Sequence, residues 1–442
     1  MGTGTATLPL HRSLLARLAE ARARTDEIFD IVRPEALYDR PIPERHRIIF
    51  YLGHLEAFDW NLLSGRVFDL EAFDQGLDKL FAFGIDPVGG GLPTDQPSDW
   101  PARAEVDVYN RRVRETIDAR LARASFSDPA QPLLLDGLLV QVAIEHRLMH
   151  AETLAYMLHQ LPLDRKLSRP GAPAPAAATA SPSMVDIPAG VATLGLPRAR
   201  GLFGWDNEFE AHQAEVPAFR IDAYPVTNGE YLKFLEAGGY SEKSFWNGAD
   251  WEWRAAQGVE HPRFWTQRDS RWLCRTMFDE VPLPPDWPVH VSHAEASAYA
   301  RWAGKRLPTE AEFHRAAYGT PSGSEREYPW GNQTPEPRFG NFDFARWDPA
   351  PVAAHPAGAS AFGAHDLVGN GWEWTRTVFG PFAGFERFSF YPGYSADFFD
   401  GNHYVMKGGS ARTAACMLRR SFRNWFQSHY QYVYAKFRCI EN

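Results

Sequence analysis

Hydrophobic residues in the first part of the chain recur every three or four positions, which is the spacing of one face of an α-helix. We expect four helices there, at Leu10 to Phe29, Pro43 to about Leu63, Glu105 to Ala124 and Pro132 to about Leu161. Prolines at or just before a helix start suit the first turn, where a backbone N–H has no helical partner. Four amphipathic helices with polar connections predict an up-down bundle over residues 1–168.

The pattern changes after residues 169–183, which are rich in proline and alanine and have the composition of a linker. From 184 to 442, short apolar runs such as Phe219 to Ile221 alternate with clusters of Gly, Pro, Asn and Trp. Helical spacing is confined to about Asn228 to Leu235, His293 to Trp302 and Thr309 to Tyr318. We therefore expect an α+β protein, with a helical bundle followed by a loop-rich domain.

Length and composition indicate the number of domains and argue against some classes of partner. The 442 residues exceed what one hydrophobic core usually serves, so two domains are expected. A net charge of -9 with no basic run argues against nucleic acid, and no apolar run is long enough to cross a membrane. Three scattered cysteines are too few for a disulfide framework, which favours a reducing cytoplasm. Nothing in the sequence indicates the oligomeric state.

Three histidines in the helical half form a candidate metal site. His146 and His150 stand four residues apart, so they share one face of the fourth helix. His54 lies on the apolar stripe of the second helix. Three imidazoles would leave coordination positions open, as a catalytic metal requires, and imidazole suits Fe, Zn, Cu and Ni. Glu152 is a candidate to orient one of these rings.

The alternative for each of these histidines is a purely structural role. A single histidine such as His54 is more often an ordinary core or surface residue than a ligand, whereas a pair with helical spacing is a stronger signal. We interpret His46 and His159 as surface residues.

The pattern His146-x-x-x-His150-x-Glu152, with an upstream histidine, resembles the ergothioneine sulfoxide synthase family. The second half resembles the sulfatase-modifying-factor, or formylglycine-generating-enzyme, fold. The matching stretches are 203–208 (FGWDNE), 225–228 (PVTN), 306–312 (RLPTEAE), 328–332 (YPWGN), 369–375 (GNGWEWT), 408–410 (GGS) and 422–425 (FRNW).

This resemblance implies a DinB-like four-helix bundle and a C-type-lectin-like formylglycine-generating-enzyme domain. It also implies Fe(II) held by the three histidines, O2 as co-substrate, and hercynine, which is Nα-trimethylhistidine, as acceptor. A thiol would add to the imidazole C2 of hercynine and its sulfur would be oxidised to a sulfoxide. By the same resemblance, Asn424 and Trp425 lie in the substrate pocket.

The chain departs from the family where a charged donor would bind. Many members have Asp where this chain has Phe426, and some have an Arg in the long loop, whereas residues 84–102 contain no Arg or Lys. Burying a carboxylate without a basic partner is costly. Candidate replacements are Arg412, Arg419, Arg420 and Arg423. Phe426 and Met149 are expected to line a less charged substrate pocket; Met149 stands where Gln is frequent and adds a polarisable contact.

A second departure concerns the proton donor. The best-studied members have a proton-supplying Tyr after the Trp-Glu-Trp-Thr stretch, and this chain has Phe379, Phe382 and Phe385 near that point. Tyr391 and Tyr394 are the candidate replacements, and a proton source elsewhere is the alternative; Phe379 and Phe382 are expected to line the substrate pocket.

These losses favour a neutral donor, and a related branch, the selenoneine synthases, joins a selenosugar to hercynine. The sequence analysis therefore favours selenoxide formation from a selenosugar over sulfoxide formation from cysteine or γ-glutamylcysteine. Either activity would make the chain an Fe(II)-dependent oxidoreductase.

Three hypotheses from other functional classes stay open. A DinB-type zinc thiol transferase would use the same histidines, because three imidazoles also suit zinc. A binding module of lectin type would not need the histidines at all. Formylglycine generation would need a cysteine pair, and Cys416 and Cys439 are the only candidates.

Overall fold

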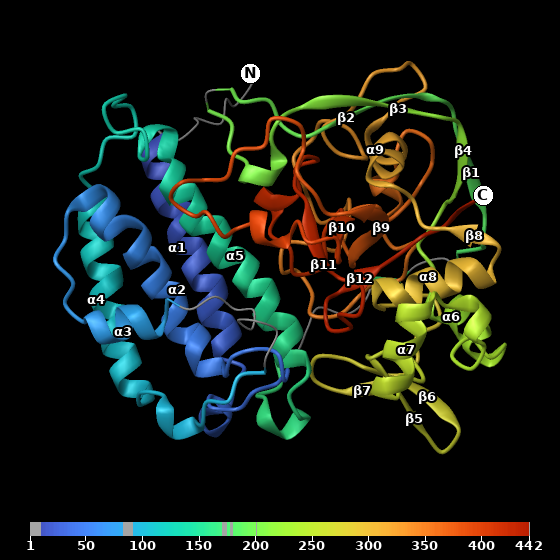
Figure 1. The fold of residues 1–442 in the computed structure, drawn as a ribbon, viewed down its shortest axis with the longest axis horizontal. Helices are drawn as coiled ribbons and strands as arrows, with labels where there is room; N and C mark the ends of the chain where they lie inside the picture. The colour runs from blue at the N-terminus through green and yellow to red at the C-terminus, as the bar shows by residue number, and fades with distance from the viewer. Residues whose placement is uncertain (1–9, 83–91, 170–174, 177–179, 200, 442) are drawn as a thin grey trace. The chain divides into compact units, whose positions relative to one another are not determined.

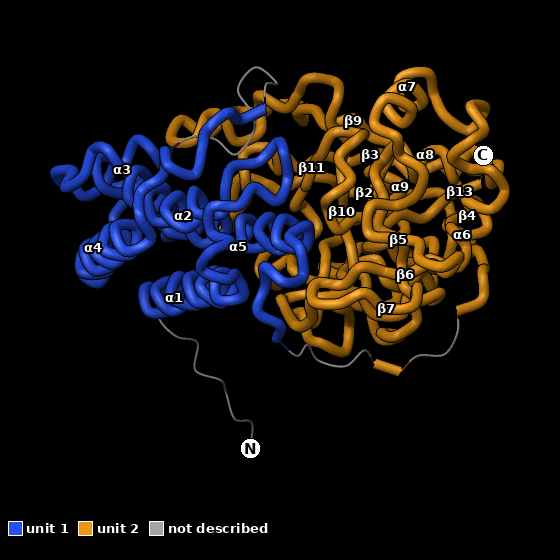
Figure 2. Tube along the Cα trace, turned by 90° about the horizontal axis from the view of Figure 1, so that it is seen from below, with its two compact units in different colours: residues 1–169 blue, residues 170–442 orange. Residues whose placement is uncertain are grey.

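The computed structural model describes residues 10–82, 92–169, 175–176, 180–199 and 201–441. The chain divides into two compact units, residues 1–169 and 170–442, which are coloured separately in Figure 2. Much of the predicted linker and the first part of the long loop at residues 84–102 lie outside the described residues.

Unit 1 is a helical bundle, as the hydrophobic spacing predicts (Figure 1). Helix α1 packs beside α5, and α2 packs beside α4 and α5. The helices of its described part are α1 (Leu10–Phe29), α2 (Ile48–Leu63), α3 (Gln75–Leu80), α4 (Arg103–Leu121) and α5 (Leu138–His159).

The second helix begins at Ile48, so the prediction of a start at Pro43 is wrong. The backbone N–H groups of Ile48 and Ile49 donate to the carbonyls of Asp39 and Leu37, at 3.2 and 2.8 Å. Pro43 therefore lies in the preceding irregular segment, because proline suits turns as well as helix starts.

The fourth long helix, α5, begins at Leu138 and not near Pro132. Asp136 and Gly137 have left-handed backbone angles, with φ of 52° and 76°, which no α-helix continues through. Helix α4 is shifted by two or three residues from the prediction, and the short α3 was not predicted. Its N-cap Asp74 accepts a hydrogen bond from the Leu77 N–H.

Two histidines predicted at the surface are more enclosed than expected. His159 is buried at the end of α5, with 4% exposure, because the whole last turn of that helix is buried and not only one face of it. His46 is half-buried, and its ring lies 4.1 Å from that of Phe50.

Unit 2 contains short strands joined by long loops, as predicted. Its described sheets have the strand orders β1-β4-β13-β8, β11-β10-β9-β12, β2-β3 and β5-β6-β7. The strands are β1 (Met184–Ile187), β2 (Gly190–Leu194), β3 (His212–Val216), β4 (Phe219–Asp222), β5 (Trp265–Arg268), β6 (Arg271–Arg275), β7 (Glu280–Pro282), β8 (Lys305–Arg306), β9 (Trp372–Val378), β10 (His403–Lys407), β11 (Asn424–Gln427), β12 (Ala435–Lys436) and β13 (Ile440–Glu441). The α+β fold class is thus confirmed.

The three helices predicted in unit 2 are present as α6 (Asn228–Glu236), α8 (His293–Trp302) and α9 (Glu310–Tyr318). Each begins with a capping box, in which an N-cap hydroxyl and a glutamate three residues later bond each other's backbone N–H. A further helix, α7 (Gly248–Gln257), was not predicted; Asn247 caps its start and Gly258 ends it in a left-handed conformation.

The core of unit 2 centres on β9, where Trp372, Glu373 and Trp374 are at most 1% exposed. The Arg438 guanidinium donates to the Glu373 carboxylate at 2.7 Å, which offsets the cost of burying both charges. None of the helices in the described ranges is both long and apolar enough to span a bilayer.

Candidate metal centre and aromatic cluster

Helix α2 positions His54, which is 6% exposed and stacks on the Phe50 ring at a centroid distance of 4.9 Å. Its Nδ1 lies 2.7 Å from the Phe81 carbonyl oxygen. Because a carbonyl can only accept, Nδ1 carries the hydrogen and donates it, and the lone pair is left on Nε2. Among the described residues, no group hydrogen-bonds that buried Nε2.

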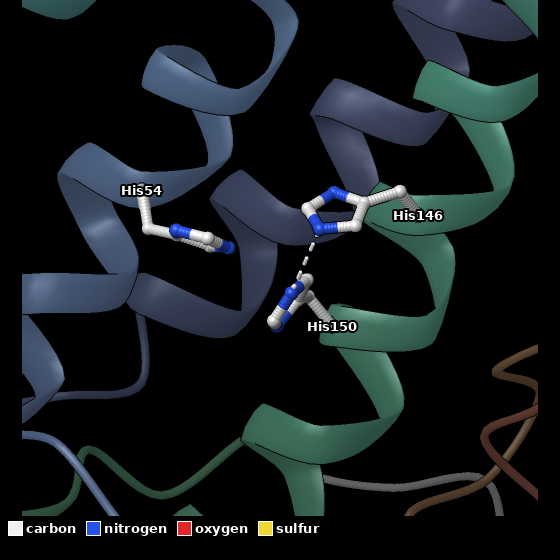
Figure 3. A group of neighbouring side chains, drawn as sticks. All are labelled: His54, His146 and His150. Carbon is white, nitrogen blue, oxygen red and sulfur yellow. Dashed lines mark hydrogen bonds between the residues drawn. The ribbon is translucent and has the colours of Figure 1, made fainter. Parts of the chain in front are cut away.

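Helix α5 supplies the other two imidazoles one turn apart. His146 and His150 are 3% and 5% exposed, and their Nε2 atoms lie 3.1 Å apart. The His146 ring stacks on Phe58 of α2. Figure 3 shows the His54 ring directed toward this pair. The ring centroid of His54 lies 5.4 Å from that of His146 and 4.9 Å from that of His150.

The three predicted ligands therefore come together. One ligand atom from each residue lies within 4.8 Å of the other two. Burial lowers the pKa of His54 to about 4 and the pKa values of His146 and His150 well below their ordinary range. The imidazoles are thus neutral near pH 7, which is the form that binds metals. Three neutral imidazole nitrogens, one of them the His54 Nε2 that has no hydrogen-bond partner in the described part of the chain, fit a metal ion such as iron or zinc.

Two residues of α5 were predicted to act beside the metal. Met149 is half-buried between the two histidines of the helix, and its carbonyl accepts a bond from the Thr153 hydroxyl. Glu152 is 6% exposed. Its predicted part in orienting an imidazole stays a prediction.

In unit 2, the indole of Trp425 is the centre of what we call the Trp425 cluster, which also comprises Phe379, Tyr394 and Phe398. Phe379 stacks parallel to the indole, with centroids 4.2 Å apart. Tyr394 meets it edge-on at 5.4 Å, and Phe398 lies at 5.6 Å. Trp425 itself is half-buried. The predicted substrate residues Trp425 and Phe379 and the predicted proton donor Tyr394 are thus neighbours.

Tyr391 lies farther from the indole. Its ring is 5.6 Å from Tyr394 and 6.3 Å from Trp205. The loop that carries both tyrosines is held by the Ser395 hydroxyl, which donates to Asp206 at 2.6 Å, and by stacking of Tyr394 on Trp205 at 4.0 Å.

The other two predicted substrate residues of strand β11 have their side chains on the opposite face of the strand from Trp425. Asn424, Trp425 and Phe426 are consecutive in a strand, so Asn424 and Phe426 point to one face and Trp425 to the other. Phe426 lies opposite Tyr404 of β10 and stacks on Tyr430 at 4.9 Å. Any ligand that contacts Trp425 through its ring is on the other side of the sheet from the Phe426 ring.

The four arginines proposed as carboxylate binders already have partners. Arg423 is 3% exposed, donates to Glu310 at 3.0 Å and lies over the Phe382 ring at 4.0 Å. Arg419 pairs with Glu208, and Arg420 with Glu325. Arg412 donates to the Phe344 carbonyl and lies over the Trp347 ring.

Sequence reasoning missed the groups that hold the candidate ligands in place. The Phe81 carbonyl is 27 residues from His54, and a backbone acceptor leaves no signal in the residue type. Phe58 had a weak signal, because it stands four residues after His54 on the same helix. Phe398 reaches Trp425, and Trp205 reaches Tyr394, only through the course of the loops, which the residue types do not reveal.

Comparisons with known proteins fit both units. The model of the sulfatase-modifying factor enzyme 1-like domain matches residues 170–442, and that of the DinB superfamily matches residues 17–154. The hercynine oxygenases of Mycobacterium tuberculosis and Mycolicibacterium thermoresistibile are 36% and 35% identical to the chain. The first alignment covers 96% of this chain and 97% of that protein, and the second covers 94% and 92%. Ergothioneine biosynthesis protein 1 of Neurospora crassa is 29% identical over 92% of this chain and 55% of its own length. The chain therefore belongs to the ergothioneine sulfoxide synthase-like family that includes the hercynine oxygenases.

Proposed function

We propose that the chain is an Fe(II)-dependent oxygenase that uses O2 to join a sulfur- or selenium-containing donor to the imidazole C2 of hercynine. The observation that carries the proposal is the meeting of three buried, neutral imidazoles from α2 and α5. The names of the relatives, hercynine oxygenase and ergothioneine biosynthesis protein 1, support hercynine as the acceptor.

With a thiol donor, the reaction balances as follows. The C2–H and S–H bonds break, and a C–S and an S=O bond form. O2 takes up the four electrons; one oxygen atom enters the sulfoxide, and the other leaves as water with both protons. Iron held by His54, His146 and His150 would supply the centre at which O2 is bound and reduced.

The chain's own residues have three proposed tasks. The apolar rings of Phe50 and Phe58 keep water from the imidazoles. The Trp425 ring binds the trimethylammonium of hercynine, because aromatic faces attract cations. Tyr394 is the proposed proton donor, since its ring is edge-on to Trp425 whereas Tyr391 is farther away.

For the donor, a thiol is the first candidate, because ergothioneine contains sulfur and a relative is named for its biosynthesis. One observation favours a selenosugar as the second. Arg419, Arg420 and Arg423 are each paired with a carboxylate, so a donor carboxylate would have to displace a glutamate.

The experiment is anaerobic reconstitution with Fe(II), followed by O2, hercynine and either cysteine, γ-glutamylcysteine or a selenosugar, with products read by mass spectrometry. An adduct carrying one extra oxygen atom supports the proposal, and the donor that yields it decides between sulfur and selenium. No adduct with any donor from iron-loaded protein contradicts it.

The same assay tests the other classes. A zinc thiol transferase would be active with Zn(II) and without O2, and a binding module would hold hercynine equally well after His54→Ala. Formylglycine generation is disfavoured, because it needs a pair of neighbouring cysteines, whereas Cys416 is exposed and Cys439 is buried.

A further inference from the structure

A group of buried charges lies beside the three histidines, and the proposed reaction does not use it. Arg147 follows His146 on α5 and is 1% exposed. Its guanidinium donates to Glu56 and to Asp59, both at 2.9 Å. Both carboxylates are on α2 and are 1% exposed. These three residues are called the Arg147 network.

The Arg147 network is attached directly to the turns that carry the candidate ligands. Arg147 donates a further bond, of 3.0 Å, to the backbone carbonyl of Leu55, the residue after His54. The guanidinium is planar and has its donors in a fixed fork. Three acceptors on one side of α2 therefore fix both the rotation of α2 and its height relative to α5.

The other two long helices hold the network from outside. Arg114 of α4 donates to Glu56 at 2.8 Å and also pairs with Asp26 of α1. Burial alone would raise the pKa of Glu56, but Arg147 and Arg114 outweigh it and lower the pKa to about 2. Glu56 is thus an anion at neutral pH.

Stability alone is a poor reason for such a group. Replacing buried ion pairs by well-packed apolar residues is often neutral or stabilising, because desolvation consumes the Coulomb attraction. Hydrogen bonds from a planar guanidinium to charged acceptors are directional, whereas apolar contacts are not. The directed bonds here join α5, next to His146, to α2, next to His54.

We infer that the Arg147 network is a positioning device that sets the separation of His54 from the His146–His150 pair and so determines the geometry and affinity of the metal site. The inference rests on the proposed function only in requiring that the three imidazoles bind a metal. Arg147 is a positioning residue, because its guanidinium donates to groups of α2 and so acts on the metal only through the backbone that carries the histidines.

The test is a Co(II) titration of the full-length protein, whose visible absorption reports coordination geometry. Arg147→Lys keeps the charge but loses the fork, and Glu56→Gln keeps the shape but loses the charge. Arg165→Lys is the matched control. Arg165 donates from two nitrogens to the carboxylate of Asp39, but this pair is more exposed than the Arg147 network. Changes in groups that orient metal ligands typically weaken metal binding about 10- to 100-fold.

We expect Arg147→Lys and Glu56→Gln to weaken Co(II) binding by that factor and to shift its absorption bands, while Arg165→Lys leaves both unchanged. Wild-type affinity and bands in both network variants would overturn the inference, even if their melting temperatures fall. If Arg147→Lys does not fold, Glu56→Gln decides. If the wild-type protein binds neither Co(II) nor Fe(II), the metal site itself fails, and that result is distinct from a failure of the network alone.

Discussion

His54 donates its Nδ1 hydrogen to the Phe81 carbonyl, 2.7 Å away, and this bond leaves the Nε2 lone pair directed toward His146 and His150. The ring of Phe81 in turn packs against Gly53, the residue before His54. A Cβ built at Gly53 would lie 2.4 Å from carbons of that ring. The glycine therefore allows the close approach that fixes the tautomer of His54.

Gly53→Ala is accordingly expected to displace Phe81 and loosen its bond to His54. Overpacking of this kind costs about 1–3 kcal/mol, more than the gain in helix propensity from glycine to alanine. Urea unfolding should show the loss, and Fe(II) affinity should fall with it. Gly65→Ala is the control, because nothing lies within 4 Å of a Cβ there. Equal stabilities of the two variants would refute the packing argument.

Trp425, whose indole stacks on Phe379, is the proposed binding residue for the trimethylammonium of hercynine. Replacing Trp425 by Leu removes an aromatic face whose attraction for a cation amounts to about 0.5–2 kcal/mol. We expect KM for hercynine to rise about 2- to 30-fold. Trp330→Leu is a suitable comparison, since Trp330 is also half-buried and stacked, on Phe339 at 4.8 Å. The same KM in both variants would contradict the proposal that Trp425 binds hercynine.

Tyr394 and Tyr391 can be separated by single hydroxyl deletions. Loss of a proton donor typically costs about 10²–10⁴ in rate, so Tyr394→Phe should lower kcat by at least about 100-fold with little change in KM. The ring remains to stack on Trp205, so the variant should still fold. Tyr391→Phe should keep most of the activity; the reverse ranking would transfer the role to Tyr391.

Acid should destabilise unit 2 through His290. Its buried Nε2 donates to the Asn370 carbonyl at 3.0 Å. Burial, reinforced by the charge of Lys436, lowers the pKa from 6.5 to about 4 despite that bond. Between these values the unfolded chain binds the extra proton and the folded protein does not. Stability is therefore lost as the pH falls from 6.5 toward 4, at up to about 1.4 kcal/mol per pH unit.

His290→Gln can donate the same bond without titrating, so its free energy of unfolding should depend less on pH within that window. Urea unfolding at several pH values measures the slope, with His261→Gln as a comparison at a half-buried histidine. A slope equal to that of the wild type would show that His290 does not contribute.

The elements that could be predicted are those whose signals are local. Helices α8 and α9 follow from a hydroxyl residue, a glutamate three residues later and an apolar stripe. The start of α5 was misplaced, because the apolar pattern continues back toward Pro132 through Asp136, which has a left-handed conformation and donates its N–H to the Phe126 carbonyl at 2.9 Å. The start of α2 was placed at Pro43 because proline suits a first helical turn, whereas the helix begins at Ile48, where the N–H groups of Ile48 and Ile49 bond the Asp39 and Leu37 carbonyls.

The candidate metal ligands could be proposed because two of them share one helix face at a fixed spacing. The groups that hold these ligands in place could not be predicted. Arg147 meets its partners Glu56 and Asp59 across 91 and 88 residues of sequence, and such contacts exist only in the folded bundle. Trp425 and Phe426 were both predicted to line the substrate pocket. Because they are neighbours in strand β11, their side chains point to opposite faces.

The central claim, that three buried imidazoles hold the metal, is tested most directly by anaerobic equilibrium dialysis with Fe(II). We predict one iron per wild-type chain, retention of iron in His159→Gln on the same helix, and loss of iron in each of His54→Ala, His146→Ala and His150→Ala. Undiminished iron in the three alanine variants, with the chain still folded, would contradict the account.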